Sequence, residues 1–280
     1  MWTMADFGTT LRAAMEANGP LCVGIDPHPG LLAAWGLEDN AESVLRFSLR
    51  VIEAMDGVAA IVKPQVALYE RFGSAGFAAL EQTLAAARAQ GLLTLADAKR
   101  GDIGSTMAAY ASAWLDDSSP LAADAVTLSP YLGYESLRPA IDLAARTGRG
   151  VFILGLTSNP EGPSVQHVGG AASVAKTVID AVARENAGAG DLGHVGLVIG
   201  ATVGDAPAKL GIDLAATKAP LLTPGLGAQG ATARDLADSF AGSFGQVLAT
   251  SSRDILQAGP DRPTLRARAE AVRAELIAAG

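Results

Sequence analysis

The chain has 280 residues, of which 49% are hydrophobic, so it can bury the core of one large domain or of two small ones. Its 21 basic and 29 acidic residues give a net charge of −8, which argues against a nucleic-acid-binding protein. No uncharged apolar run reaches the roughly 18 residues of a membrane span, and no signal peptide is evident, so we expect a cytoplasmic protein that does not enter a membrane.

Strand and helix patterns alternate from the start of the chain. Apolar residues at helical spacing predict a helix over residues 7–15, which Gly19-Pro20 ends. Apolar runs at 21–25 and 58–62 predict the first two strands, and Asn40 can cap the helix between them. Asp26 and Lys63 directly follow these strands.

A third apolar run, 91–96, leads into a charged segment with Asp97, Lys99 and Asp102. Side chains alternate along a strand, so Asp97 and Lys99 should point the same way, while Asp102 lies where the chain turns toward a helix. Charges are costly to bury unless they are paired, so this cluster favours a functional site. A salt-bridge group at the surface is the alternative.

The alternation of apolar runs and helical patterns continues to the end of the chain. Eight strands predict a single (β/α)₈ barrel over residues 1–280, and their apolar rather than alternating pattern is typical of parallel sheets. An open doubly wound sheet is the alternative, but no G-x-G-x-x-G follows the first strand. The remaining strands are expected at 124–128, 150–154, 195–199, 220–223 and 246–249.

In such a barrel the active site lies at the carboxyl ends of the strands. Asp26, Lys63, Asp97 and Lys99 end three consecutive strands and should therefore converge on one side of the barrel mouth. Asp26 alone could be a turn residue, and Lys63 alone could be a surface lysine. Four charges at neighbouring strand ends are harder to explain in that way.

The opposite side of the mouth has the composition of a phosphate site. A glycine-rich segment, 223–230, follows the seventh strand, and Ser251-Ser252-Arg253 follows the eighth. Phosphate sites in these barrels are frequently built from those two loops. Arg253 would supply a local cation for an anionic substrate in an acidic protein. The single cysteine excludes an intrachain disulfide, and the three histidines show no metal-ligand spacing.

Five segments, in order and over most of the chain, resemble the orotidine 5′-phosphate decarboxylases, above all their longer bacterial branch. They are Gly24-Ile25-Asp26-Pro27, Val62-Lys63-Pro64, the stretch from Asp97 to Thr106, Leu156-Thr157-Ser158-Asn159 and the stretch from Pro224 to Gly230. Lys63 narrows the match, because the related sugar-phosphate decarboxylases and synthases carry Glu there and use Mg²⁺. The match departs mainly in the long loops 156–170 and 204–219, where the resemblance implies no role beyond that of Ser158.

The resemblance implies the conversion of orotidine 5′-phosphate to uridine 5′-phosphate and CO₂, the last step of pyrimidine nucleotide synthesis, without a metal or cofactor. Lys99 would protonate C6 and Asp97 would lie beside the substrate carboxylate. Lys63 and Asp26 would complete the charged network and touch the ribose.

The resemblance also implies a homodimer with shared active sites. Asp102, Ile103 and Thr106 would reach into the partner's site, and Ser158 would contact the pyrimidine. The phosphate would be held by Gln229 and Arg253, with a loop that includes Pro224 and Gly225 closing over it.

Three other functions stay open at this point. A Mg²⁺-dependent sugar-phosphate decarboxylase or synthase would need the metal. A catalytically silent barrel would bind nucleotides without turnover. A Schiff-base aldolase would use Lys99 or Lys63, and borohydride would trap its intermediate.

Overall fold

The computed structural model describes residues 6–227 and 230–280. Eight parallel strands form a closed barrel in sequence order, with the last strand paired to the first. This confirms the predicted (β/α)₈ fold. The strands are β1 Leu21–Ile25, β2 Ile61–Pro64, β3 Leu93–Arg100, β4 Ala125–Leu128, β5 Gly150–Leu156, β6 Val195–Ile199, β7 Leu221–Pro224 and β8 Val247–Ser251.

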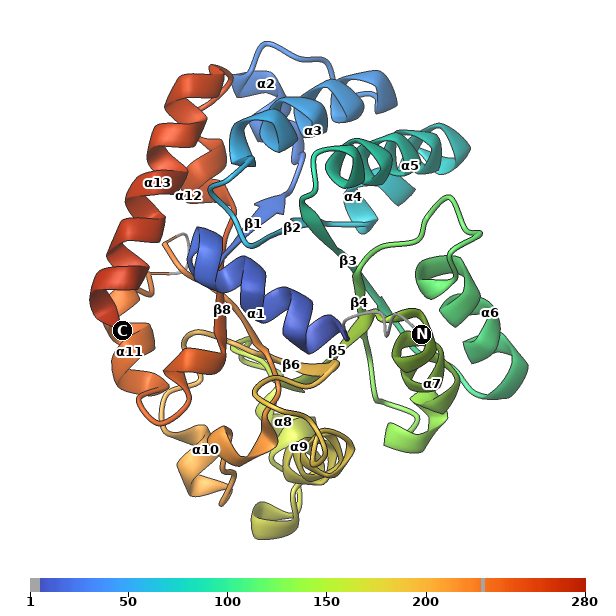
Figure 1. Cartoon of the computed structure of the whole chain (residues 1–280), viewed down its shortest axis with the longest axis vertical. Coiled ribbons are helices and arrows are strands. Elements are labelled where there is room, and N and C mark those ends of the chain that lie inside the picture. Colours follow the sequence, from blue (N-terminus) through green and yellow to red (C-terminus); the bar gives the residue numbers. More distant parts are fainter. Residues whose placement is uncertain (1–5, 228–229) are drawn as a thin grey trace.

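Helices surround the barrel and cover the outer faces of its strands (Figure 1). Their buried apolar residues form one large core with the outward-facing residues of the strands. The surrounding helices are α2 Pro29–Ala34, α3 Ala41–Met55, α4 Ala67–Glu70, α5 Gly73–Ala89, α6 Gly104–Leu115, α7 Arg138–Thr147, α8 Pro163–Gln166, α9 Val174–Glu185, α10 Ala206–Lys209, α11 Ala233–Ser239, α12 Arg253–Leu256 and α13 Arg262–Ala279. Among the described residues, no helix combines the length and the apolar composition that a bilayer crossing needs.

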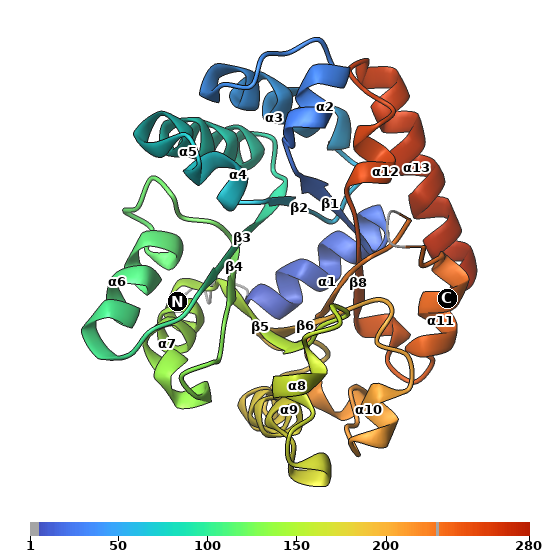
Figure 2. The ribbon, with the colours of Figure 1, turned by 180° about the vertical axis from the view of Figure 1, so that it is seen from behind.

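Helix α1 (Phe7–Asn18) crosses the amino-terminal end of the barrel (Figure 1). Its buried face, Phe7, Leu11 and Met15, packs against side chains that fill the barrel interior. The ring of Phe7 meets that of Phe152 edge to face, with 6.0 Å between centroids. Helix α1 therefore closes this end of the barrel, and the carboxyl ends of the strands face the other side (Figure 2).

Strand β2 begins three residues later than the apolar run at 58–62 predicts. The N–H groups of Val58 and Ala59 donate to the carbonyl of Met55, so these two residues complete the end of α3 instead. The predicted cap of that helix is confirmed, because Asn40 Oδ1 accepts from the N–H of Ser43 at 2.8 Å. The shift places Lys63 inside β2 rather than just beyond it.

Candidate active site

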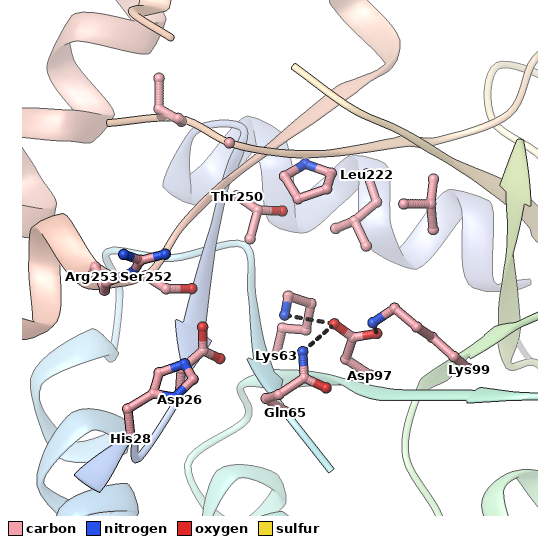
Figure 3. A pocket seen from close by; sticks show the side chains of 14 residues that line it. Asp26, His28, Lys63, Gln65, Asp97, Lys99, Leu222, Thr250, Ser252 and Arg253 are labelled. Carbon is pink, nitrogen blue, oxygen red and sulfur yellow. Dashed lines mark hydrogen bonds and ion pairs between the residues drawn. The ribbon is translucent and has the colours of Figure 1, made fainter. Parts of the chain in front are cut away.

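A pocket of about 300 Å³ opens at the carboxyl ends of the strands (Figure 3). Its charged side chains come from β2, β3, the residue after β1 and the first residue of α12, as the barrel topology predicts. The lining residues are Asp26, His28, Lys63, Gln65, Asp97, Lys99, Val198, Leu222, Pro224, Gly225, Leu226, Thr250, Ser252 and Arg253.

Asp97 is the centre of the charged group. The residue is only 8% exposed, and both carboxylate oxygens accept two hydrogen bonds. Oδ2 accepts from Lys63 Nζ at 3.0 Å and from Gln65 Nε2 at 3.0 Å. Oδ1 accepts from Lys99 Nζ at 2.5 Å and from Thr127 Oγ1 at 2.9 Å. Four donors from β2, β3, β4 and the residue after β2 thus fix the carboxylate in one orientation.

The two lysines keep Asp97 ionised in spite of its burial. Burial alone would raise the pKa of Asp97, but Lys63 and Lys99 outweigh it and hold that pKa well below its usual range. Burial would likewise lower the pKa of Lys63, but Asp97 and Asp26 raise it above its usual value. Asp97 and Lys63 therefore form a charged pair at neutral pH.

Lys99 differs from Lys63 in exposure and in backbone conformation. Its side chain is 45% exposed, whereas that of Lys63 is 5% exposed, so the Lys99 ammonium is the one open to a bound molecule. The φ of Lys99 is 48°, a left-handed conformation that costs a non-glycine residue about 1–3 kcal/mol. The hydrogen bonds of the surrounding strands must offset this cost.

Asp26 faces the same pocket from the end of β1. Its Oδ1 is buried and has no hydrogen-bond partner among the described residues. A buried carboxylate oxygen without a donor is costly, so this atom is suited to accept a hydrogen bond from a ligand hydroxyl. The backbone of Asp26 is held by a turn in which the N–H of His28 donates to the carbonyl of Asp26 at 2.7 Å.

The predicted phosphate end lies across the pocket from Asp97. Pro224 ends β7, Gly225 follows it with a φ of 125°, and Arg253 begins α12 two residues after the end of β8. All three line the pocket, so one backbone segment and one guanidinium meet there. Gln229, which was predicted to join them, lies outside the described residues.

Four predicted residues do not line this pocket. Asp102 and Ile103 lie between β3 and α6, and Thr106 lies in the first turn of α6. Ile103 is 61% exposed, and Asp102 Oδ1 accepts from the N–H of Ile103 at 2.7 Å. Ser158 follows β5 and lies beside Gly200, because a Cβ on that glycine would come within 2.9 Å of the Ser158 nitrogen.

Sequence reasoning missed Gln65 and Thr127, which both bind Asp97. Strand alternation could have found Gln65, since it lies two residues after Lys63 and points to the same side. The signal for Thr127 was a hydroxyl within the apolar run 124–128. His28 and Thr250 carried no comparable signal, whereas Ser252 belongs to the segment 251–253 that was predicted for the phosphate site.

The geometry agrees with comparisons to known proteins. The family model described as "Orotidine 5'-phosphate decarboxylase / HUMPS family" matches residues 19–268. A protein of Salinispora arenicola named orotidine 5′-phosphate decarboxylase is 55% identical over 278 residues, 99% of each chain. One of Streptomyces coelicolor with the same name is 52% identical over 276 residues, 98% of each chain.

Solved structures give the same result. The crystal structure of a putative orotidine 5′-phosphate decarboxylase from Streptomyces avermitilis superimposes with a TM-score of 0.94 at 52% identity, covering 99% of this chain and 97% of that chain. The OMP decarboxylase of Leishmania donovani matches with a TM-score of 0.74 at 29% identity, covering 97% of this chain and 99% of that one. The likeness therefore extends over the whole barrel.

Proposed function

Because the chain belongs to the orotidine 5′-phosphate decarboxylase / HUMPS family, we propose that its pocket converts orotidine 5′-phosphate to uridine 5′-phosphate and CO₂ with Lys99 as the proton donor. The protein is a carboxy-lyase of pyrimidine nucleotide synthesis. The observation that carries the assignment of roles is the Lys63–Asp97–Lys99 chain, whose exposed end is the Lys99 ammonium.

The reaction breaks the bond between C6 and the carboxylate. CO₂ leaves, the electron pair stays on C6, and the Lys99 ammonium donates a proton there and later regains one from solvent. A cation beside C6 stabilises the charge that develops in the transition state, which is where binding energy accelerates the reaction. Asp97 cannot turn away from the substrate carboxylate because four donors hold it, so it disfavours the bound substrate relative to the transition state.

The rest of the pocket binds the parts of the substrate that do not react. Asp26 and Lys63 would contact the ribose hydroxyls, which is supported by the partnerless Oδ1 of Asp26. Arg253, Pro224 and Gly225, together with Gln229, would hold the phosphate. Binding energy from the phosphate can then close the loop and exclude water.

A homodimer with shared active sites is part of the proposal. Exposed apolar side chains follow two neighbouring strands: Ile103 after β3, and Tyr131 and Leu132 after β4, at 61%, 82% and 54% exposure. Apolar surface of this kind is suited to a subunit interface. Asp102, Ile103 and Thr106 would cross it into the partner's site, while Ser158 would meet the pyrimidine.

We also propose that residues 1–280 form one catalytic domain, that the protein works in the cytoplasm, and that it needs no metal or cofactor. The test is the loss of orotidine 5′-phosphate absorbance, with uridine 5′-phosphate identified as the product, using protein exhaustively treated with EDTA. We expect full activity. A strict requirement for added Mg²⁺ would favour the sugar-phosphate alternative, and nucleotide binding without turnover would favour a silent barrel.

A further inference from the structure

The end of β3 that carries Asp97 and Lys99 is irregular. Ala96 pairs with Val126 and Arg100 pairs with Leu128, so three residues of β3 lie opposite Thr127 alone. Such a bulge bends the strand and redirects its side chains. Asp97 and Lys99 both lie in it, and Lys99 takes its left-handed φ there.

A bulge leaves backbone groups without partners in the sheet, and these groups must bond elsewhere. The N–H of Lys99 donates to Thr127 Oγ1 at 2.9 Å, so a side chain replaces the missing backbone acceptor. The carbonyl of Ala98 accepts from Arg100 Nη1 at 3.0 Å, so here too a side chain takes the place of a backbone partner.

Thr127 also holds the carboxylate. Its Oγ1 donates to Asp97 Oδ1 at 2.9 Å, and that same oxygen accepts from Lys99 Nζ at 2.5 Å. The hydroxyl has one proton, which goes to Asp97, and it accepts the N–H of Lys99 through a lone pair. One fully buried hydroxyl therefore fixes both the backbone of the proton donor and the carboxylate that the donor contacts.

We propose that Thr127 is a positioning residue, whose hydroxyl sets the placement of Asp97 and Lys99 in the decarboxylation site. The inference rests on the proposed function, because it concerns the same reaction. Thr127 does not line the pocket, so it acts through its two neighbours and not on the nucleotide. Its loss should therefore lower kcat and leave nucleotide affinity nearly unchanged.

The test compares Thr127→Val, which keeps the shape and removes the hydroxyl, with Thr127→Ser, which keeps the hydroxyl. We expect Thr127→Val to lower kcat about 10- to 100-fold, as displacements near 1 Å do at reacting centres. The Kd for uridine 5′-phosphate should stay within about threefold, and Thr127→Ser should recover most of kcat.

Thr94, near the amino-terminal end of the neighbouring strand β3, offers a matched control. Its Oγ1 donates to Asp124 Oδ2 at 2.8 Å and accepts from the N–H of Asp124 at 3.1 Å, and the residue is buried. Thr94→Val thus removes the same two kinds of hydrogen bond, one to a carboxylate and one from a backbone N–H, at a residue that does not line the pocket. It should lower thermal stability as Thr127→Val does, but leave kcat unchanged.

Each outcome decides between the alternatives. Inactive wild-type protein would refute the proposed function itself, whereas an active wild type with normal kcat in Thr127→Val would refute only the positioning role. Equal losses of kcat in Thr94→Val and Thr127→Val would also refute the positioning role. So would a kcat in Thr127→Ser that is no higher than that of Thr127→Val. If Thr127→Val does not fold, Thr127→Ala against Thr127→Ser gives the same comparison.

Discussion

The ammonium of Lys99 lies 2.5 Å from Oδ1 of Asp97, and it is the exposed member of a chain of charges that begins at buried Lys63. Neutralising the Asp97 carboxylate would remove the ion-pair partner of both Lys63 and Lys99, and would therefore lower the stability of the folded protein. The same charged group therefore contributes both to folding stability and to the proposed reaction. Substitutions at single members of the group can distinguish these two contributions.

Lys99→Ala should abolish turnover but leave nucleotide binding measurable. Proton donation is a role in the transition state, and loss of a general acid costs up to about 10⁴-fold in rate. Steady-state assays with orotidine 5′-phosphate, together with calorimetry of uridine 5′-phosphate, separate the two effects. Lys209→Ala removes an exposed lysine paired with Asp205 and serves as the control. Near-normal turnover in Lys99→Ala would show that another group donates the proton.

Arg253→Ala should weaken the binding of uridine 5′-phosphate strongly. Removing one partner of a desolvated, hydrogen-bonded charge pair costs about 2–5 kcal/mol. Uridine, which lacks the phosphate, should bind the variant and the wild type equally, and calorimetry with both ligands measures this. Arg268→Ala is a close control, since Arg268 pairs with Asp254 at 2.7 Å beside Arg253. An equal loss of uridine affinity would place Arg253 away from the phosphate.

Asp97→Asn should destabilise the protein at neutral pH by about 3–5 kcal/mol, because it removes the carboxylate that forms the ion pair with buried Lys63. The folded state lowers the pKa of Asp97, so the carboxylate stabilises the folded protein fully at pH values above its unfolded pKa of about 3.9. This stabilisation declines as the pH falls from there toward the lower pKa of the folded state. Urea unfolding of both proteins from pH 7 to pH 3 measures this. Their difference in free energy of unfolding should shrink below about pH 4, and a constant difference would contradict the assignment.

The sequence predicted the barrel and five of its charged pocket residues, four of them at the ends of the first three strands, for a simple physical reason. Buried parallel strands are apolar runs, so an interruption such as Asp97 or Lys63 stands out, and parallel topology brings strand ends together. The bulge in β3 could not be predicted in this way, since it depends on how Asp97, Ala98 and Lys99 pair with Thr127 across the sheet. Register is a property of two strands, and a pattern within one of them does not contain it.

The boundary of β2 shows a related limit. Val58 and Ala59 are as apolar as the strand that follows, but their N–H groups bond to the end of α3. Hydropathy reports that a residue is buried and not which element takes its backbone hydrogen bonds. Lys63 was therefore expected just after the strand, whereas it lies within β2. Its position in the pocket was predicted correctly.

Mixing two inactive variants should restore activity if the sites are shared between subunits. Lys99→Ala and Asp102→Ala homodimers should each be nearly inactive, since each would lack one group in both sites. In a hybrid, one site carries both substitutions and the other carries neither, because a two-fold interface is self-complementary. Random pairing of equal amounts makes about half of the dimers hybrids, so activity should recover to about a quarter of wild type. Sedimentation of each homodimer and exchange of differently labelled subunits provide the controls. If subunits exchange and activity does not return, Lys99 and Asp102 act within one chain, or Asp102 is not required.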